Sequence, residues 1–514
     1  MATIDTPATP ASSVTTVATT RVEVRMYCLG TGDCLVLKFF AAERCQFTML
    51  IDCGSCVGSR AEFLPYVQDL ARYVEGRLDL LVVTHEHQDH VNGFAKCQAE
   101  FEQLEIGEAW FAWTEDPNDP DQLALDLLGK RQKARLGLQV ALDKLHANQQ
   151  QIKAEQVNLK ANRQALVALD AFLDGMDTLG SVNLEAAKPA DQSLAGMRAI
   201  KELLVRKQVR IRYLKPGVSL MPLELPGVRF HVLGPAIDRR YIYAEGKEGR
   251  DTYRRHEVVG DGILAMNSFA TLHQEPATAD LPFAAHYTLK TADAGFASAY
   301  PPDAPAAYRR QTRKLVQEYV VEANRWRDIE NEWLYTAGAL AIRLDSHINN
   351  TSLALAVELG DGGPVLLLPG DAEFANWAGW HQVEKWQGLG PKGKHFVEDL
   401  LNRTVFYKVS HHLSYNGTPL DLGVRLMNSP DLAVMVTLDR SRISSRWRTT
   451  MPNKRLLQEL LDRSQGRCIV MNDLELGAGT AATAADLQAL GELRYSVITQ
   501  GGQVLAKQYT VHVG

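Results

Sequence analysis

Residues 78–90 have the sequence LDLLVVTHEHQDH, in which an apolar segment runs directly into a cluster of histidines and acids. The apolar segment predicts a buried β-strand. Its end is followed at once by His85, His87, Asp89 and His90. Imidazole nitrogens and carboxylate oxygens bind cations such as Zn²⁺ and Mn²⁺, and packing alone rarely gathers His and Asp at the end of a buried strand. The sequence therefore predicts a metal site at the end of this strand.

Two later segments place further polar side chains after apolar strands. Asp371 follows the apolar segment 365–368, and His411 and His412 follow a predicted strand over 404–409. A carboxylate can bridge two cations about 3.5–4 Å apart, as in two-metal hydrolases. Tandem histidines suit a ligand with a neighbouring acid–base partner. His347, which precedes Asp371 along the chain, either completes the metal site or is an ordinary loop residue.

Composition and charge narrow the class of protein. The chain has 514 residues, a formal net charge of −6 and seven cysteines. The negative charge argues against a protein coated with basic residues for nucleic acid, although a local basic groove stays compatible. The odd number of cysteines fits a reducing compartment, and Cys53 and Cys56 lack a second pair that would complete a zinc knuckle. No segment has the length and hydrophobicity of a membrane span or a signal peptide, so we expect a cytoplasmic protein with no membrane segment.

The pattern of strands and helices predicts an α/β core interrupted by large helical insertions. Leucine or isoleucine recurs every seven residues between 138 and 173, without Gly or Pro, which predicts a long helix. Whether that helix covers the core, joins two copies of the chain or binds a partner protein stays open. The predicted organisation is a disordered tail (1–20), the first part of the core (21–115), a helical insertion (116–207), core strands (208–236), a second insertion (237–335) and the second part of the core (336–514).

In these motifs the chain resembles the metallo-β-lactamase superfamily. The histidine cluster, Gly370-Asp371 and His411 follow the order of that superfamily's motifs. Further segments are similar to the hydrolase domain of the bacterial competence DNA-uptake channel (ComEC-type) and its stand-alone relatives. These segments are Leu29-Gly30-Thr31-Gly32-Asp33, Leu50-Ile51-Asp52-Cys53-Gly54, Asn350-Thr351-Ser352-Leu353, Leu368-Pro369-Gly370-Asp371 and Tyr407-Lys408-Val409-Ser410-His411-His412.

The resemblance implies an αββα sandwich with two divalent metal ions, Zn or Mn, at one edge of the two sheets. His85 and His87 would hold the first ion, Asp89, His90 and His411 the second, and Asp371 would bridge them. Support around the ligands or contact with substrate would come from Asp33, Asp52, Asn350, Ser352 and Ser414. Two features depart from the pattern: Leu413 stands where a glycine is usual, and the superfamily's third histidine has no clear counterpart, with Asn350 and Ser352 in that region.

The implied chemistry is hydrolysis by a hydroxide that two metal ions activate, with Asp89, His412 and Lys408 as catalytic residues. We expect a phosphodiesterase or nuclease that acts on DNA, RNA or a nucleotide, by similarity to the competence-type proteins. Limited support comes from a basic run that could grip phosphates and stack bases. It contains Arg440, Arg442, Arg446, Trp447 and Arg448. The alternatives are a hydrolase of thioesters, lactones or β-lactams, and a partner-regulated scaffold with a relic site.

Overall fold

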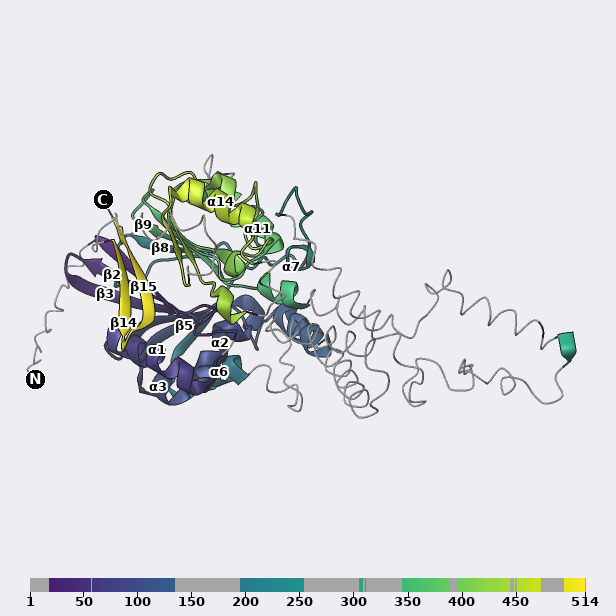
Figure 1. Ribbon diagram of the computed structural model, residues 1–514, viewed down its shortest axis with the longest axis horizontal. Coiled ribbons are helices and arrows are strands. Elements are labelled where there is room, and N and C mark those ends of the chain that lie inside the picture. Colours follow the sequence, from purple (N-terminus) through teal and green to yellow (C-terminus); the bar gives the residue numbers. More distant parts are fainter. Residues whose placement is uncertain are drawn as a thin grey trace, which may run out of the picture.

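The computed structural model describes most of the predicted core and little of the predicted insertions (Figure 1). The tail up to residue 17, the long helix expected over 138–173 and most of the second insertion lie outside the described residues. So do Arg446 and Trp447 of the basic run. The described residues are 18–56, 58–134, 195–253, 305–307, 310, 344–387, 395–443, 448, 451–472 and 494–513.

The first sheet joins the two ends of the chain. Antiparallel pairing connects the C-terminal strands to the first three strands, with Val24 opposite both Tyr509 and Leu37. From β3 onward the pairing becomes parallel. The strand order is β14 (Tyr495–Gln500), β15 (Gln503–His512), β1 (Arg21–Tyr27), β2 (Leu35–Ala41), β3 (Arg44–Ile51), β4 (Arg77–Val83), β5 (Glu105–Ala112) and β6 (Arg210–Leu214).

The second sheet is also mixed. Its parallel half runs from β10 to β13, and its antiparallel half runs from β10 to β7. The strand order is β13 (Cys468–Val470), β12 (Ala433–Val436), β11 (Thr404–Lys408), β10 (Val365–Leu368), β9 (Ala354–Leu359), β8 (Val228–Gly234) and β7 (Ser219–Leu220). Strands β9, β10 and β12 are buried along their whole length, and β11 is buried except at the half-buried Val405, as their apolar sequences predict.

The two sheets pack face to face between helices. One apolar cluster joins side chains of both sheets, among them Val24, Met49, Phe230 and Leu355. A second cluster covers the outer face of the first sheet with α1 (Arg60–Tyr73), α2 (Gln88–Lys96), α3 (Gln98–Gln103) and α6 (Ala195–Arg206). A third covers the outer face of the second sheet with α11 (Phe374–Trp380), α12 (Glu384–Gln387), α13 (Phe396–Asn402) and α14 (Lys454–Ser464). The described part of the chain is therefore an α/β structure of four layers, visible in Figure 1 with α1, α2, α3 and α6 below the sheets and α11 and α14 above them.

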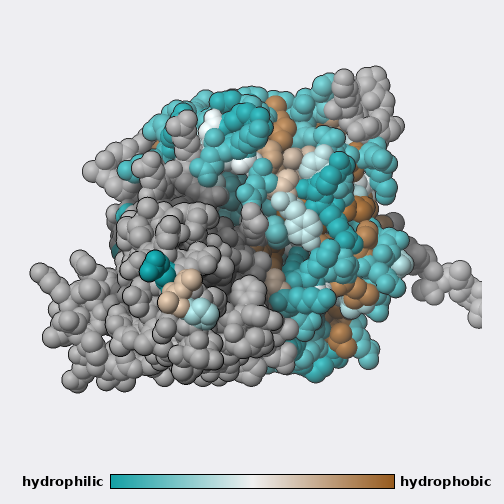
Figure 2. All heavy atoms as spheres, turned by 90° about the vertical axis from the view of Figure 1, so that its right-hand side faces the viewer, coloured by the Kyte–Doolittle hydropathy of each residue, from teal (hydrophilic) through white to brown (hydrophobic). Residues whose placement is uncertain are grey.

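Short helices fill the connections between these elements. They are η1 (Trp113–Glu115), α7 (Arg240–Tyr243), η8 (Ser410–Leu413), η9 (Val424–Leu426) and η10 (Arg440–Arg442). Helical residues 123–134 and 344–349 complete the described secondary structure. No helix within these described ranges is long and apolar enough to cross a membrane. On the face shown in Figure 2, the coloured surface is mainly hydrophilic, with apolar residues in small separate groups.

The parallel strands of both sheets place their following loops at one edge. Asp52 comes directly after β3, Thr84 and His85 after β4, Asp371 soon after β10, and His411 after β11. Ligands of parallel sheets bind outside the carboxyl ends of the strands, where such loops converge. We therefore expect the predicted ligands to meet at this edge.

Candidate metal centre

Asp52 organises the histidine loop that follows β4. Its carboxylate accepts hydrogen bonds from the Thr84 backbone N–H at 2.8 Å and from the Thr84 hydroxyl at 2.6 Å, and it lies 2.8 Å from Nδ1 of His90. A carboxylate behind one imidazole nitrogen fixes the ring and leaves the other nitrogen to face a metal, the usual arrangement around metal-binding histidines. Asp52 adopts a left-handed φ of 55°, which Asp tolerates better than most residues.

Four buried residues meet around Asp371. We call Asp33, His90, Asp371 and His412 the Asp371 group: one ligand atom from each lies within 4.8 Å of the others, so the group could hold a metal ion. Oδ2 of Asp371 lies 3.1 Å from Nε2 of His90 and 3.0 Å from Nε2 of His412. Oδ2 of Asp89 also lies 3.0 Å from Nε2 of His412. Asp89 therefore flanks the group through His412.

His85 and His87 point unsatisfied nitrogens into this region. The ring of His85 lies beside those of His87 and His90. Its centroid is 4.7 Å from that of His87 and 4.1 Å from that of His90. Nε2 of both residues is buried and has no hydrogen-bond partner among the described residues. Burying a polar atom without a partner is costly, and a cation bound to these nitrogens would remove that cost. The residues present thus fit a metal ion by their chemistry and their burial.

Lys408 holds two of the acids together. Its ammonium donates to Oδ1 of Asp371 at 2.9 Å and to the Gly370 carbonyl at 3.0 Å, and it lies 2.5 Å from Oδ2 of Asp33. Burial lowers the pKa of Lys408, but the carboxylates of Asp33 and Asp371 outweigh burial and raise that pKa above its ordinary value. Lys408 is therefore a fixed positive charge behind the Asp371 group.

The tandem histidines diverge into different surroundings. His411, His412 and Leu413 all adopt left-handed φ values, of 47°, 48° and 67°. The turn directs His412 toward Asp371 and Asp89, whereas Nδ1 of His411 lies 3.2 Å from Oε1 of Glu373. The resemblance assigns His411 to the second metal ion; the structure places His412, not His411, in the Asp371 group.

A second acidic group lies beside the first. Asp345, Glu373 and His411, here the Asp345 group, also bring ligand atoms within 4.8 Å of one another. Oδ1 of Asp345 lies 3.6 Å from Nε2 of His87, so His87 stands at the edge of this group. Neither Asp345 nor Glu373 belongs to any of the sequence motifs that predict the site. The only signal was their position, two residues before His347 and two residues after Asp371.

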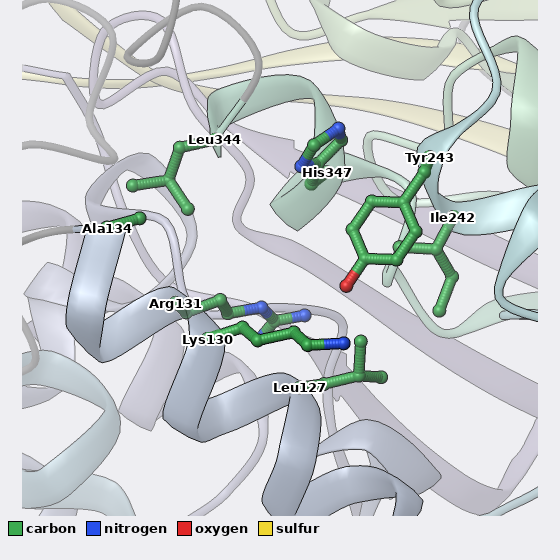
Figure 3. A pocket seen from close by; sticks show the side chains of 8 residues that line it. All are labelled: Leu127, Lys130, Arg131, Ala134, Ile242, Tyr243, Leu344 and His347. Atoms are coloured by element: carbon green, nitrogen blue, oxygen red, sulfur yellow. The ribbon is translucent and has the colours of Figure 1, made fainter. Parts of the chain in front are cut away.

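Several predicted site residues serve other contacts. His347 packs its ring against Tyr243, with centroids 4.6 Å apart, and lines a small pocket beside Arg131 and Leu344, outside both groups (Figure 3). Oδ1 of Asn350 accepts the backbone N–H of Asn376 in α11. Ser414 donates to Asn416.

Two of the predicted supporting residues do reach the candidate ligands. The hydroxyl of Ser352 accepts the backbone N–H of Asp371 and lies 3.3 Å from Nδ1 of His85. Asp33, expected to support the ligands or contact substrate, belongs to the Asp371 group itself. Ser352 thus links the loops that follow β4 and β10.

The arginines of the basic run that the structure describes contact the protein itself. Arg442 pairs with Glu62 at 2.7 Å. Arg440 donates to the Arg448 carbonyl, and Arg448 donates to the Ser441 and Ile443 carbonyls. These contacts give the run a structural role.

Charges in the site follow from its burial. The carboxylates of Asp371 and Asp89 outweigh burial and raise the pKa of His412 to about 9. Burial lowers the pKa of His87 to about 4, so this ring is neutral at neutral pH. Burial and the neighbouring Glu373 raise the pKa of Asp345, against the attraction of His411. In the absence of a cation, protons on the histidines offset the excess of carboxylates, and a bound metal ion would displace protons from its ligands.

Comparison with known proteins gave no relative: no protein-family model and no curated protein matches this chain.

Proposed function

We propose that this protein is a metal-dependent hydrolase of the metallo-β-lactamase type. The observation that carries the proposal is the Asp371 group, because four buried side chains with the chemistry of metal ligands lie within reach of one ion. Two sheets between helical layers, with the group at the carboxyl-terminal edge of both sheets, are compatible with the αββα sandwich that the sequence motifs imply.

The residues that would hold a divalent cation are His90, Asp371 and His412, with Asp89 and Asp33 beside them. Bound Zn²⁺ or Mn²⁺ would polarise the scissile group and lower the pKa of an attacking water. The resemblance assigns His85 and His87 to the first of its two ions, and their unsatisfied nitrogens favour an ion there as well.

The chain's own side chains prepare this chemistry in three ways. Asp52 fixes the ring of His90 through Nδ1. Lys408 donates to Oδ1 of Asp371; burial raises the pKa of Asp371, but His412 and Lys408 outweigh burial and lower it. Burial raises the pKa of Asp89, but His90 and His412 outweigh burial and lower it far below its usual range. Asp89 is then a weak base that orients a water by accepting a hydrogen bond and does not take its proton.

For the substrate we propose a phosphodiester, on the strength of the resemblance to competence-type hydrolases. Thioesters, lactones and β-lactams form a second candidate class, because the described arginines of the basic run bind the protein itself. These less charged substrates need no basic groove.

A side-by-side cleavage assay tests the proposal. Plasmid, single-stranded DNA, RNA and bis(p-nitrophenyl) phosphate would be offered with Mn²⁺ or Zn²⁺, next to a thioester, a lactone and a β-lactam. We expect metal-dependent phosphodiester cleavage, reduced at least 100-fold in Asp89→Ala, with Asp361→Asn as a matched carboxylate variant on the surface. If only the thioester, the lactone or the β-lactam is hydrolysed, the second candidate class replaces phosphodiesters as the proposed substrate. Full activity of Asp89→Ala, or turnover that survives complete metal removal, would refute the site.

A further inference from the structure

The Asp345 group has the composition of a metal position, although the sequence motifs assign none of its acids. Its two carboxylates come from helical residues 344–349 and from the loop before α11, and its imidazole comes from η8. Asp345 and Glu373 are both buried, with side chains 10% and 4% exposed. Two buried carboxylates with oxygens within 4.8 Å of each other repel unless a cation or a proton lies between them.

Neighbouring groups fix the two acids without neutralising them. Glu373 accepts hydrogen bonds from the Ser346 hydroxyl and from Nδ2 of Asn349, the latter at 3.0 Å. Both donors are uncharged. Among the described residues, the ion pairs of Asp345 and Glu373 involve only His87 and His411, and no lysine or arginine. The Asp371 group differs in this respect, because Lys408 lies beside its acids.

His87 provides an independent indication of a ligand. Its side chain is 4% exposed, and its Nε2 has no hydrogen-bond partner among the described residues. That nitrogen lies 3.6 Å from Oδ1 of Asp345, which is too long for a hydrogen bond. Two atoms bound to one Zn²⁺ at about 2.1 Å each lie about 3.4 Å apart in tetrahedral geometry. The separation is therefore close to that of two ligands on a common ion.

We infer that His87, Asp345, Glu373 and His411 form a second cation position, adjacent to the Asp371 group. Imidazole combined with carboxylate favours Mn²⁺ or Zn²⁺. In this chain two acids and the first of the tandem histidines take the place of the third histidine that the sequence lacks. The inference rests on the proposed function only in its premise that this edge of the sheets binds metal.

The alternative for the Asp345 group is a shared proton with no metal. In that case His411 and Glu373 form an ion pair, and Asp345 is a neutral acid hydrogen-bonded to its surroundings. The two accounts differ in the number of ions that the folded chain binds. They also differ in the effect of Asp345→Asn, which removes the charge and keeps the shape.

Metal counting on the full chain decides between them. Protein stripped with a chelator would be titrated with Mn²⁺ by calorimetry, and bound metal would be counted by mass spectrometry after dialysis. We expect two ions per chain in the wild type and one in Asp345→Asn, or at least a tenfold weaker second ion. Electron paramagnetic resonance should show a spin-coupled pair in the wild type and an isolated Mn²⁺ in the variant. Asp361→Asn, which changes a carboxylate whose side chain is 88% exposed, should bind as the wild type does.

A variant of the Asp371 group separates this inference from the proposed function. His412→Asn should keep the ion bound by the Asp345 group and lose the other. If Asp345→Asn binds as many ions as the wild type, with unchanged affinity, while His412→Asn loses one, the inference is wrong and the proposed function stands. If the wild type binds no ion, both are wrong. Glu373→Gln should lose or weaken the second ion as Asp345→Asn does. It takes the place of Asp345→Asn in this test if circular dichroism shows that Asp345→Asn is unfolded.

Discussion

His412 is the residue whose protonation responds most directly to the site around it. Its Nε2 lies 3.0 Å from carboxylate oxygens of both Asp89 and Asp371, and its Nδ1 lies 3.0 Å from the Thr437 carbonyl. Burial lowers the pKa of His412, but the carboxylates of Asp371 and Asp89 outweigh burial and raise that pKa to about 9, above the value of about 6.5 for an unfolded histidine. A raised pKa in the folded state stabilises the fold fully below pH 6.5, and this stabilisation is lost as the pH rises through 9.

We therefore expect the metal-free protein to lose up to about 3 kcal/mol of unfolding free energy between pH 6.5 and pH 9.5. Urea unfolding in the presence of a chelator, monitored by circular dichroism, measures this change. His412→Asn should show a flatter pH dependence over the same range. An equal slope in the two proteins would contradict the assigned surroundings of His412.

Leu413 stands in a backbone conformation that glycine adopts more easily. Its φ of 67° costs an ordinary residue about 1–2 kcal/mol, which glycine avoids. Its side chain, however, is fully buried in the cluster beneath α14, and removal of a buried leucine side chain costs about 2–5 kcal/mol.

The free energy lost with the buried leucine side chain therefore exceeds the free energy gained by relieving the backbone strain. We expect Leu413→Gly to destabilise the fold by about 1–3 kcal/mol, as the difference of these two effects. Chemical unfolding at one fixed metal concentration measures it. A variant more stable than the wild type would show that the strain at this turn is the larger effect.

At the scale of elements, helical residues 123–134 connect the predicted insertion to the histidine loop that follows β4. One side chain makes this connection. Arg131 is buried and donates to Glu86 at 3.1 Å, to Glu115 at 3.2 Å and to the Thr351 hydroxyl at 2.6 Å. Glu86 lies between His85 and His87 in the sequence. This helix thus fixes the loop that carries the histidines.

Replacement of Arg131 by methionine removes the cation from beside two buried carboxylates. Breaking a buried ion pair in this way costs about 3–5 kcal/mol. We expect Arg131→Met to lose stability of that order and to bind Mn²⁺ more weakly, as thermal unfolding and calorimetry would show. Arg240→Met, which breaks an exposed pair with Asp238, should leave stability nearly unchanged. Equal effects of the two substitutions would refute a special role for Arg131.

At the scale of the whole molecule, metal binding should stabilise the fold because its ligands come from distant parts of the chain. His90 and Asp89 follow β4, whereas Asp371 and His412 follow β10 and β11 in the other sheet. An ion that binds only the folded chain adds about 2.7 kcal/mol when its free concentration is 100 times Kd.

Thermal unfolding with and without Mn²⁺ or Zn²⁺ tests this expectation. The wild type should unfold at a higher temperature with metal and at a lower temperature after chelation, in a concentration-dependent way. Asp371→Asn, which changes the acid shared by His90 and His412, should show a smaller response, because only the ion of the Asp345 group can then bind. No metal response in the wild type would argue against a metal centre that joins the two sheets.

The sequence by itself determined the elements of the core and the edge at which the site lies. Apolar segments such as 78–83 and 365–368 specify buried strands through local composition, and the polar residues after them are local too. The strands predicted over 365–368 and 404–409, and the one that leads into the histidine cluster, are confirmed by β10, β11 and β4. The resemblance in sequence motifs predicted that Asp52, His90 and Asp371 share one site, and in the structure His90 contacts both of these acids.

Only the tertiary structure decided which side chains meet. Two consecutive histidines look alike in sequence, but their left-handed backbone sends His412 toward Asp89, 323 residues earlier, and His411 toward Glu373. Asp345 and Glu373 belong to no local pattern, and the assembly of helical residues 344–349 beside η8 makes them neighbours. Asn350 and Ser352 stand two residues apart. Asn350 nevertheless binds α11, whereas Ser352 contacts His85 in the histidine loop that follows β4. Side-chain direction depends on backbone torsion angles and on packing between distant segments, and neither can be read from local composition.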